Sequence, residues 1–222
     1  MAFELIKNLY QQAQIAGRMG QGGDGVNIHQ GYVAQIIYLM HFFLVLFVPA
    51  LTAFSFAEEK KTRTLDLLLT SPIQSLDIVL GKFMANVVLV FVLIAFSSLY
   101  VIPMHSISPL DWPLVLSSYG GLFLISCIYV GVGIFASSLS SSVIVSFVIA
   151  LVLNLFCIFI VWGSQSAESD FAREMINHVS ISKRLMEFIQ GNIHSSGVIF
   201  LLSLIGLFVA LTHRVIESAR WR

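Results

Sequence analysis

The chain has 222 residues, of which 57% are hydrophobic and 11% are charged, and its formal net charge is zero. Because a soluble domain carries about 25% charged residues, this composition excludes an ordinary soluble protein. The absence of net charge also argues against a nucleic-acid partner. Both cysteines, Cys127 and Cys157, lie in apolar runs without a Cys-x-x-Cys partner, which favours packing over metal or redox chemistry.

Residues 1–31 form a polar N-terminal segment. Its first half has the apolar spacing of a weak amphipathic helix, and residues 17–31 are rich in Gly, Gln and Asn, as is typical of a flexible loop. The glycines at 20–25 lack the Gly-Lys-Ser/Thr ending of a phosphate-binding loop. The segment shows no secretory signal pattern, so we expect the internal apolar runs to direct membrane insertion.

Five apolar runs follow, each near the ~20 residues that a helix needs to cross about 30 Å of hydrocarbon. Their approximate bounds are 32–57, 78–102, 114–136, 143–162 and 193–212. Lipid leaves open backbone groups unsatisfied, and these runs do not alternate as barrel strands do. The sequence therefore predicts an all-α integral membrane protein, with residues 32–222 as one membrane domain of five transmembrane helices.

The long polar connection at 163–192 contains apolar residues at helical spacing, which predicts amphipathic turns resting on the bilayer surface. These residues are Phe171, Met175, Ile176, Val179, Leu185, Met186 and Ile189. In the predicted third span, small residues permit close helix approach. They are Gly120, Gly121, Gly131, Gly133 and Ala136.

Two polar side chains, His41 and Asn154, lie inside predicted spans. Ionisable groups within a membrane are functional candidates, but a lone His without a second His or an acidic residue at helical spacing is a poor proton relay. Interhelical hydrogen bonding is therefore favoured over ion transport. The sequence shows no catalytic motif and no Walker A motif, so we expect neither an enzyme nor ATP hydrolysis by this chain alone.

The densest charge cluster lies at residues 56–72, between the first two predicted spans. Glu58 and Glu59 fall at the C-terminus of the first span, where the helix dipole disfavours anions. Three basic residues follow and can offset this effect, with Glu59 and Arg63 at i, i+4 spacing. Because Lys and Arg concentrate here and at the C-terminus, we expect both regions to be cytoplasmic and the N-terminus to lie outside.

A short helix is predicted within this cluster. Thr62 or Thr64 can cap it, and Ser75 can cap the next span. Its apolar stripe and its stop are Leu65, Leu68, Leu69 and Pro72. Such a helix at the cytoplasmic surface is either a ligand for a groove on a partner protein or an interfacial helix on lipid, and the pattern alone leaves both open.

The ordered motifs of the chain resemble those of the ABC-2 type transporter permeases, most closely the gliding-motility and copper-processing branch. The resemblance covers about residues 45–222. It rests on Phe56-Ala57-Glu58-Glu59, residues 64–72, Gly81-Lys82, residues 133–139, residues 177–180 with Gly191, and residues 217–221.

The resemblance implies a permease subunit in a bacterial inner membrane, with a cytoplasmic C-terminus. It also implies a second permease copy and a separate cytoplasmic ABC ATPase subunit that binds and hydrolyses ATP to drive transport, which we expect to be export. No catalytic residue, cofactor or metal is then expected in this chain. The implied ATPase-docking residues are Glu58, Glu59, Arg63, Thr64, Leu65, Leu68, Leu69, Pro72, Gly81 and Lys82.

Two departures from the family pattern stand out. Arg63 occupies a position where the family usually has Gly, so the turn before the short helix is expected to differ. The family has six spans, and the span expected to be missing here is the first. The alternatives to a permease are a non-transporting membrane scaffold and, with thinner support from His41 and Asn154, a secondary carrier.

Overall fold

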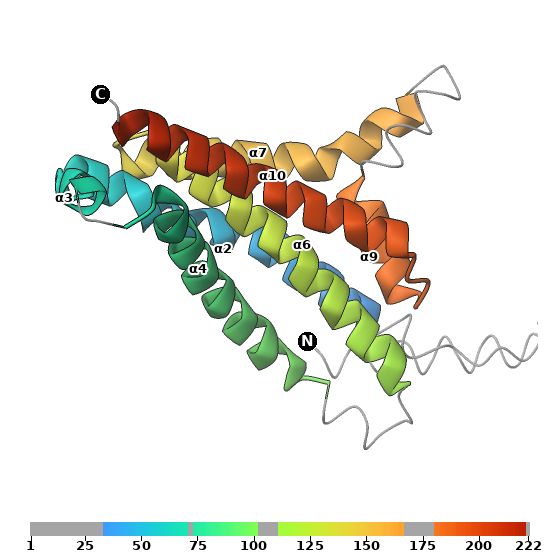
Figure 1. Ribbon diagram of the computed structural model, residues 1–222. Helices are drawn as coiled ribbons and strands as arrows, with labels where there is room; N and C mark the ends of the chain where they lie inside the picture. Colours follow the sequence, from blue (N-terminus) through green and yellow to red (C-terminus); the bar gives the residue numbers. More distant parts are fainter. Residues whose placement is uncertain (1–32, 71–72, 102–110, 167–179, 221–222) are drawn as a thin grey trace, which may run out of the picture.

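The computed structural model describes residues 33–70, 73–101, 111–166 and 180–220, so the predicted N-terminal segment lies outside it. Within these ranges the regular structure is entirely helical (Figure 1). The helices are α2 (Ala34–Lys61), α3 (Thr64–Thr70), α4 (Ser75–Ser98), α6 (Trp112–Leu139), α7 (Val143–Ser166), α9 (Ile181–Ile189) and α10 (Ser195–Arg220). The predicted all-α fold is confirmed.

Each of the five predicted spans coincides with a helix. Of the described helices, α2, α4, α6 and α10 are long and apolar enough to cross a membrane, and α7 has a shorter apolar segment, Val143–Phe159. With 28 residues, α2 is about 42 Å long, which exceeds the ~30 Å of bilayer hydrocarbon. Its last turns can therefore extend beyond the lipid and carry the charged residues that follow the apolar run.

Helix α6 lies at the centre of the bundle, and α2, α4, α7, α9 and α10 all pack against it (Figure 1). Small residues make this possible, because a Cβ added at Gly133 would lie 2.0 Å from Thr52 Oγ1 of α2. One added at Gly131 would lie 3.2 Å from Phe208 Cβ of α10. Gly120 differs from this pattern, since a Cβ there would meet nothing within 4 Å.

Helix α9 corrects the prediction for the long connection. The predicted residues Leu185 and Ile189 are buried within the protein together with Phe188, whereas we expected the apolar side of this segment to rest on the bilayer surface. Of the predicted residues on α9, Met186 alone is exposed, at 45%. The Phe188 side chain lies over Gly121 of α6, and Ser117 Oγ donates a hydrogen bond to the Phe188 carbonyl at 2.7 Å. Because Gly121 has no side chain, Phe188 can approach the α6 backbone closely. The apolar side of α9 therefore packs against protein and not against lipid. The four predicted residues at 171–179 lie outside the described ranges.

His41 and Asn154, the two polar residues singled out within the predicted spans, behave differently. His41 Nε2 of α2 lies 2.7 Å from the Tyr129 hydroxyl of α6, which confirms the predicted interhelical hydrogen bond. Asn154 is fully buried on α7, and its amide nitrogen and oxygen have no hydrogen-bond partner among the described residues. The hydrogen bond predicted for Asn154 is therefore absent from the described part of the chain.

Substituting Gly121 with alanine should loosen the α6–α9 packing. The new Cβ would lie 2.5 Å from Phe188 Cβ, so the helices must separate, at an expected cost of about 1–3 kcal/mol in the free energy of unfolding. The adjacent Gly120→Ala variant is the matched control and should be neutral or more stable by up to ~1 kcal/mol. Thermal unfolding in detergent measures both, and equal melting temperatures for the two variants would contradict the packing.

Candidate functional site

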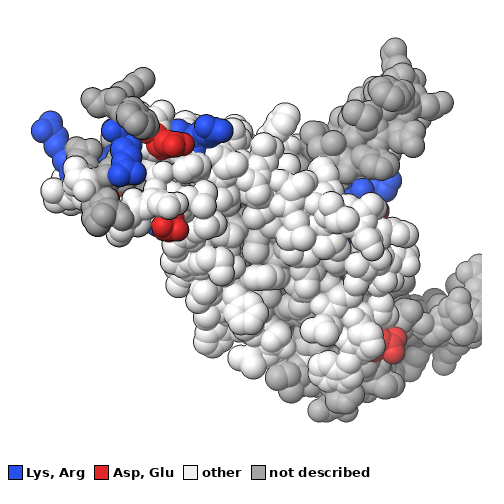
Figure 2. Space-filling model, in the orientation of Figure 1, with Lys and Arg blue, Asp and Glu red and all other residues white. Residues whose placement is uncertain are grey.

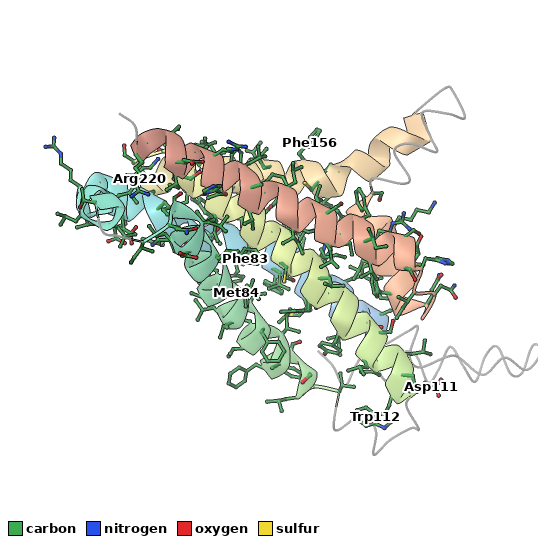
Figure 3. All side chains as sticks on the ribbon, in the orientation of Figure 1. Phe83, Met84, Asp111, Trp112, Phe156 and Arg220 are labelled. Atoms are coloured by element: carbon green, nitrogen blue, oxygen red, sulfur yellow. The ribbon has the colours of Figure 1, made fainter. Side chains whose placement is uncertain are left out.

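One end of the bundle carries the charged residues and the short helix α3. The end of α2, the start of α4 and the end of α10 lie here, and Figure 3 labels Arg220 at this end and Asp111 with Trp112 at the other. Most of the basic and acidic side chains in this view gather at this end, and a few lie on the far side of a broad uncharged surface (Figure 2). The described Lys and Arg at this end are Lys60, Lys61, Arg63, Lys82, Arg214 and Arg220, against Lys183 and Arg184 on α9.

The turn between α2 and α3 is built around Arg63. Its φ is 58°, in the left-handed region that glycine enters without steric cost and other residues rarely adopt. The Thr62 amide and hydroxyl both bond to the Glu58 carbonyl, at 2.9 and 3.0 Å. Thr64 Oγ1 lies 2.9 Å from Thr62 Oγ1. A glycine-like conformation therefore persists at a position that holds an arginine.

The predicted caps need correction. The hydroxyls of Thr62 and Thr64 bond backwards to carbonyls in the last turn of α2, where they satisfy its C-terminal end instead of capping α3. Ser75 is the first residue of α4 and not its cap, which is Gln74. The Ser75 hydroxyl lies 3.3 Å from His213 Nδ1 of α10, so it joins the two helices at this end.

Helix α3 turns part of its predicted stripe inward. Leu65 is only 3% exposed, and Leu68 packs partly buried against the same core. The outward apolar residue is Leu67, which is 73% exposed between exposed Thr64 and Thr70. Sequence reasoning missed Leu67 because spacing along the chain does not show that part of the predicted stripe packs on the protein's own core, which turns Leu67 outward.

For three of the predicted docking residues, the structure does not test a docking role. The Leu69 side chain and Pro72 lie outside the described part of the chain. Glu58 is exposed at the end of α2, beside the turn that leads into α3. Their part in docking stays a prediction.

Glu59 and Lys82 form a brace between α2 and α4. Lys82 Nζ lies 2.7 Å from Glu59 Oε1 and donates a second hydrogen bond to the Ser55 carbonyl at 2.6 Å. It also lies 5.0 Å from the centre of the Phe56 ring. The predicted pairing of Glu59 with Arg63 is therefore wrong, because Lys82 of the next helix occupies that carboxylate.

The Gly81-Lys82 pair combines an outward and an inward position. Gly81 is exposed, and a Cβ added there would meet nothing within 4 Å. Phe83 is buried and Met84 exposed on the following turn of α4 (Figure 3). Lys82 therefore makes its contacts within the protein. Gly81 leaves helix backbone exposed at the end of the bundle that carries α3.

The described residues contain no group of three His, Cys, Asp or Glu side chains that could hold a metal ion. The chemical character of this end is that of a contact surface. It presents a short helix on which Leu67 is the exposed leucine among the described side chains, set among exposed charges.

Comparison with protein families finds a match to the ABC-2 family transporter protein over residues 2–213. The chain belongs to this family. Comparisons with curated proteins and with solved structures found no match. The ABC-2 family assignment and the long apolar helices together make the chain a multi-pass membrane domain of an ABC transporter.

The left-handed turn predicts opposite effects of two substitutions at Arg63. Arg63→Gly should raise the free energy of unfolding by up to about 1 kcal/mol, because glycine adopts φ near 58° without steric cost. Arg63→Val should lower it by about 1–2 kcal/mol, because a β-branched side chain is strained there. Melting temperatures of the purified variants measure the difference. A valine variant as stable as the glycine variant would contradict the turn.

The Glu59–Lys82 brace can be tested by exchanging its charges. Lys82→Ala should cost about 1–3 kcal/mol of stability, because it leaves a half-buried carboxylate without its cation. The double variant E59K/K82E should lose less stability than the summed losses of the single variants E59K and K82E, since it restores an ion pair. Thermal unfolding of the parent, E59K, K82E and E59K/K82E measures the coupling energy between the two residues. Additive effects of the two single substitutions would rule out the brace.

Proposed function

We propose that this ABC-2 family protein is the permease subunit of an ABC transporter, and that a separate cytoplasmic ATPase subunit docks on α3. ATP binding and hydrolysis by that subunit would then drive substrate across the membrane, in the direction of export. The motif order further favours the gliding-motility and copper-processing branch, a bacterial inner membrane and a second permease copy. The concentration of Lys and Arg at the α3 end supports a cytoplasmic position for this end and for the C-terminus.

The observation that carries the docking proposal is the exposure of Leu67. An apolar side chain that is 73% exposed costs little within lipid, but α3 lies at the charged end of the bundle. The exposed neighbours Lys61, Arg63 and Thr64 support a position in water or against a protein. A groove that buries Leu67 and offers carboxylates to the two basic residues would fit this end of the chain.

Helix α3 is held firmly enough to transmit force. Leu65 anchors it in the core, the Arg63 turn ties it to α2, and the Glu59–Lys82 brace ties α2 to α4. A displacement of α3 by a closing ATPase would therefore reach the bundle and would not be lost in a flexible loop. The permease would act as a two-state element whose equilibrium is shifted by its partner.

The family match and the pairing of His41 favour a permease over the secondary-carrier alternative. His41 is hydrogen-bonded to Tyr129 within the bundle, and a carrier would need further ionisable groups beside it. The scaffold alternative differs from the permease in transport and not in docking, so it is separated by measuring whether ATP hydrolysis moves a substrate.

Leu67→Asp should abolish co-purification of the ATPase subunit, because a carboxylate cannot enter an apolar groove without losing its hydration. The expected loss of affinity is about 100-fold, from the roughly 2–4 kcal/mol typical of an interface anchor. The matched control is Ser218→Asp, which adds the same charge at an exposed position near the end of α10.

Membrane insertion and melting temperature should be unchanged in both proteins. Leu65→Ala serves as a further comparison, since Leu65 is buried and should affect stability before it affects docking. Undiminished ATPase binding by the Leu67→Asp protein would refute docking through this face of α3.

A further inference from the structure

The segment 133–139 at the end of α6 has no role in the docking site, although it is one of the motifs that resemble the family. Ser137 is fully buried and lies against α2. Its hydroxyl oxygen accepts hydrogen bonds from the backbone amides of Phe56 and Ala57, at 2.9 and 3.0 Å. The same hydroxyl donates to the Ala53 carbonyl at 2.9 Å.

These three bonds place the Ser137 hydroxyl within the backbone ladder of α2. In a regular α-helix the Ala57 amide would bond to the Ala53 carbonyl, and here the hydroxyl is bonded to both groups. Side-chain insertion into the ladder is a recognised cause of helix bending. Two turns before the Ala57 amide, Pro49 has no amide hydrogen to donate to the Val45 carbonyl. Helix α2 therefore lacks one backbone hydrogen bond at Pro49, and near its end it gains three bonds from Ser137 of α6.

Two further contacts join the same parts of the two helices. Lys60 Nζ donates to the Ser138 carbonyl at the end of α6. Thr52 contacts Gly133, where a Cβ would lie 2.0 Å from its hydroxyl oxygen. From Thr52 to Lys60, the α3-bearing end of α2 is thus attached to α6 by backbone and side-chain contacts, with Ser137 at the centre.

We propose that Ser137 is a positioning residue that locks the α3-bearing end of α2 to α6, so that a displacement of α3 is transmitted to the central helix. This inference rests on the proposed function for its driving force. The missing backbone bond at Pro49 lets the turns after it move with α6, while the Ser137 bonds prevent those turns from moving alone. The Glu59–Lys82 brace carries the same displacement to α4 by a separate contact.

The neighbouring serine provides a matched control. Ser138 is also fully buried, but its hydroxyl donates only to the Phe135 carbonyl of its own helix, at 2.7 Å. Ser138→Ala keeps the carbonyl that Lys60 contacts and removes no bond between helices. Ser137→Ala also removes a single oxygen atom, but that atom makes three hydrogen bonds to α2.

The first measurement uses the permease alone, in a background where both cysteines are replaced by alanine. Spin labels at exposed Lys61 and Leu139 report the separation between the end of α2 and the end of α6. Dipolar broadening in the electron paramagnetic resonance spectrum should be strong in the parent and in Ser138→Ala. It should fall by half or more in Ser137→Ala, with melting temperatures of the two variants within a few degrees.

The second measurement uses the complex with its ATPase subunit. Labels at exposed Phe96 and Leu116 lie on α4 and α6 at the opposite end of the bundle, and ATP trapping should change their separation in the parent and in Ser138→Ala. Ser137→Ala should still bind the ATPase but lose at least half of this change. If Ser137 only stabilised the fold, Ser137→Ala would instead lower stability and ATPase binding together.

The outcomes separate the two proposals. An unchanged Lys61–Leu139 signal or an unchanged ATP response in Ser137→Ala overturns the role of Ser137. Loss of stability or of ATPase binding in this variant also overturns it. A parent protein that binds no ATPase refutes the proposed function, and the first measurement still decides whether Ser137 locks α2 to α6.

Discussion

Close approach to α6 is the constraint on which the rest of the bundle depends. Lipid is as apolar as the helices, so no hydrophobic force brings them together and contact must come from packing and hydrogen bonds. Gly133 and Gly121 let Thr52 and Phe188 reach the α6 backbone, while Ser137 and Tyr129 supply hydrogen bonds to α2. With α2 held in this way, the turn at Arg63 places α3 at one defined position beside the bundle.

Much of the fold could be predicted from the sequence because the membrane leaves few alternatives. Apolar runs of spanning length must be helical, and the charged stretch at 56–72 had to lie beyond the lipid. The short helix was also predictable, since Pro72 follows the leucine run by three residues. The interhelical bond of His41 followed from the cost of leaving a polar group unpaired in a span, although its partner Tyr129 did not.

The remaining features depend on contacts between distant residues, which spacing along the chain does not encode. Glu59 has Arg63 at favourable spacing and nevertheless pairs with Lys82, because α4 places that cation beside it. Leu65 and Leu68 turn inward because α3 lies against α2 and the core. In the sequence, Ser137 is one residue of the family-like segment 133–139, and only the packing of α6 against α2 showed its hydroxyl between backbone groups.

The left-handed residue at Arg63 has a consequence for binding speed and strength. Since the turn and the buried Leu65 already hold α3 in shape, a partner that binds it spends little free energy on ordering a loop. Association can then proceed as a rigid-body encounter, and the contact area on the partner can be small without making the complex weak. A preorganised helix of seven residues therefore loses less free energy to ordering on binding than a longer flexible segment would.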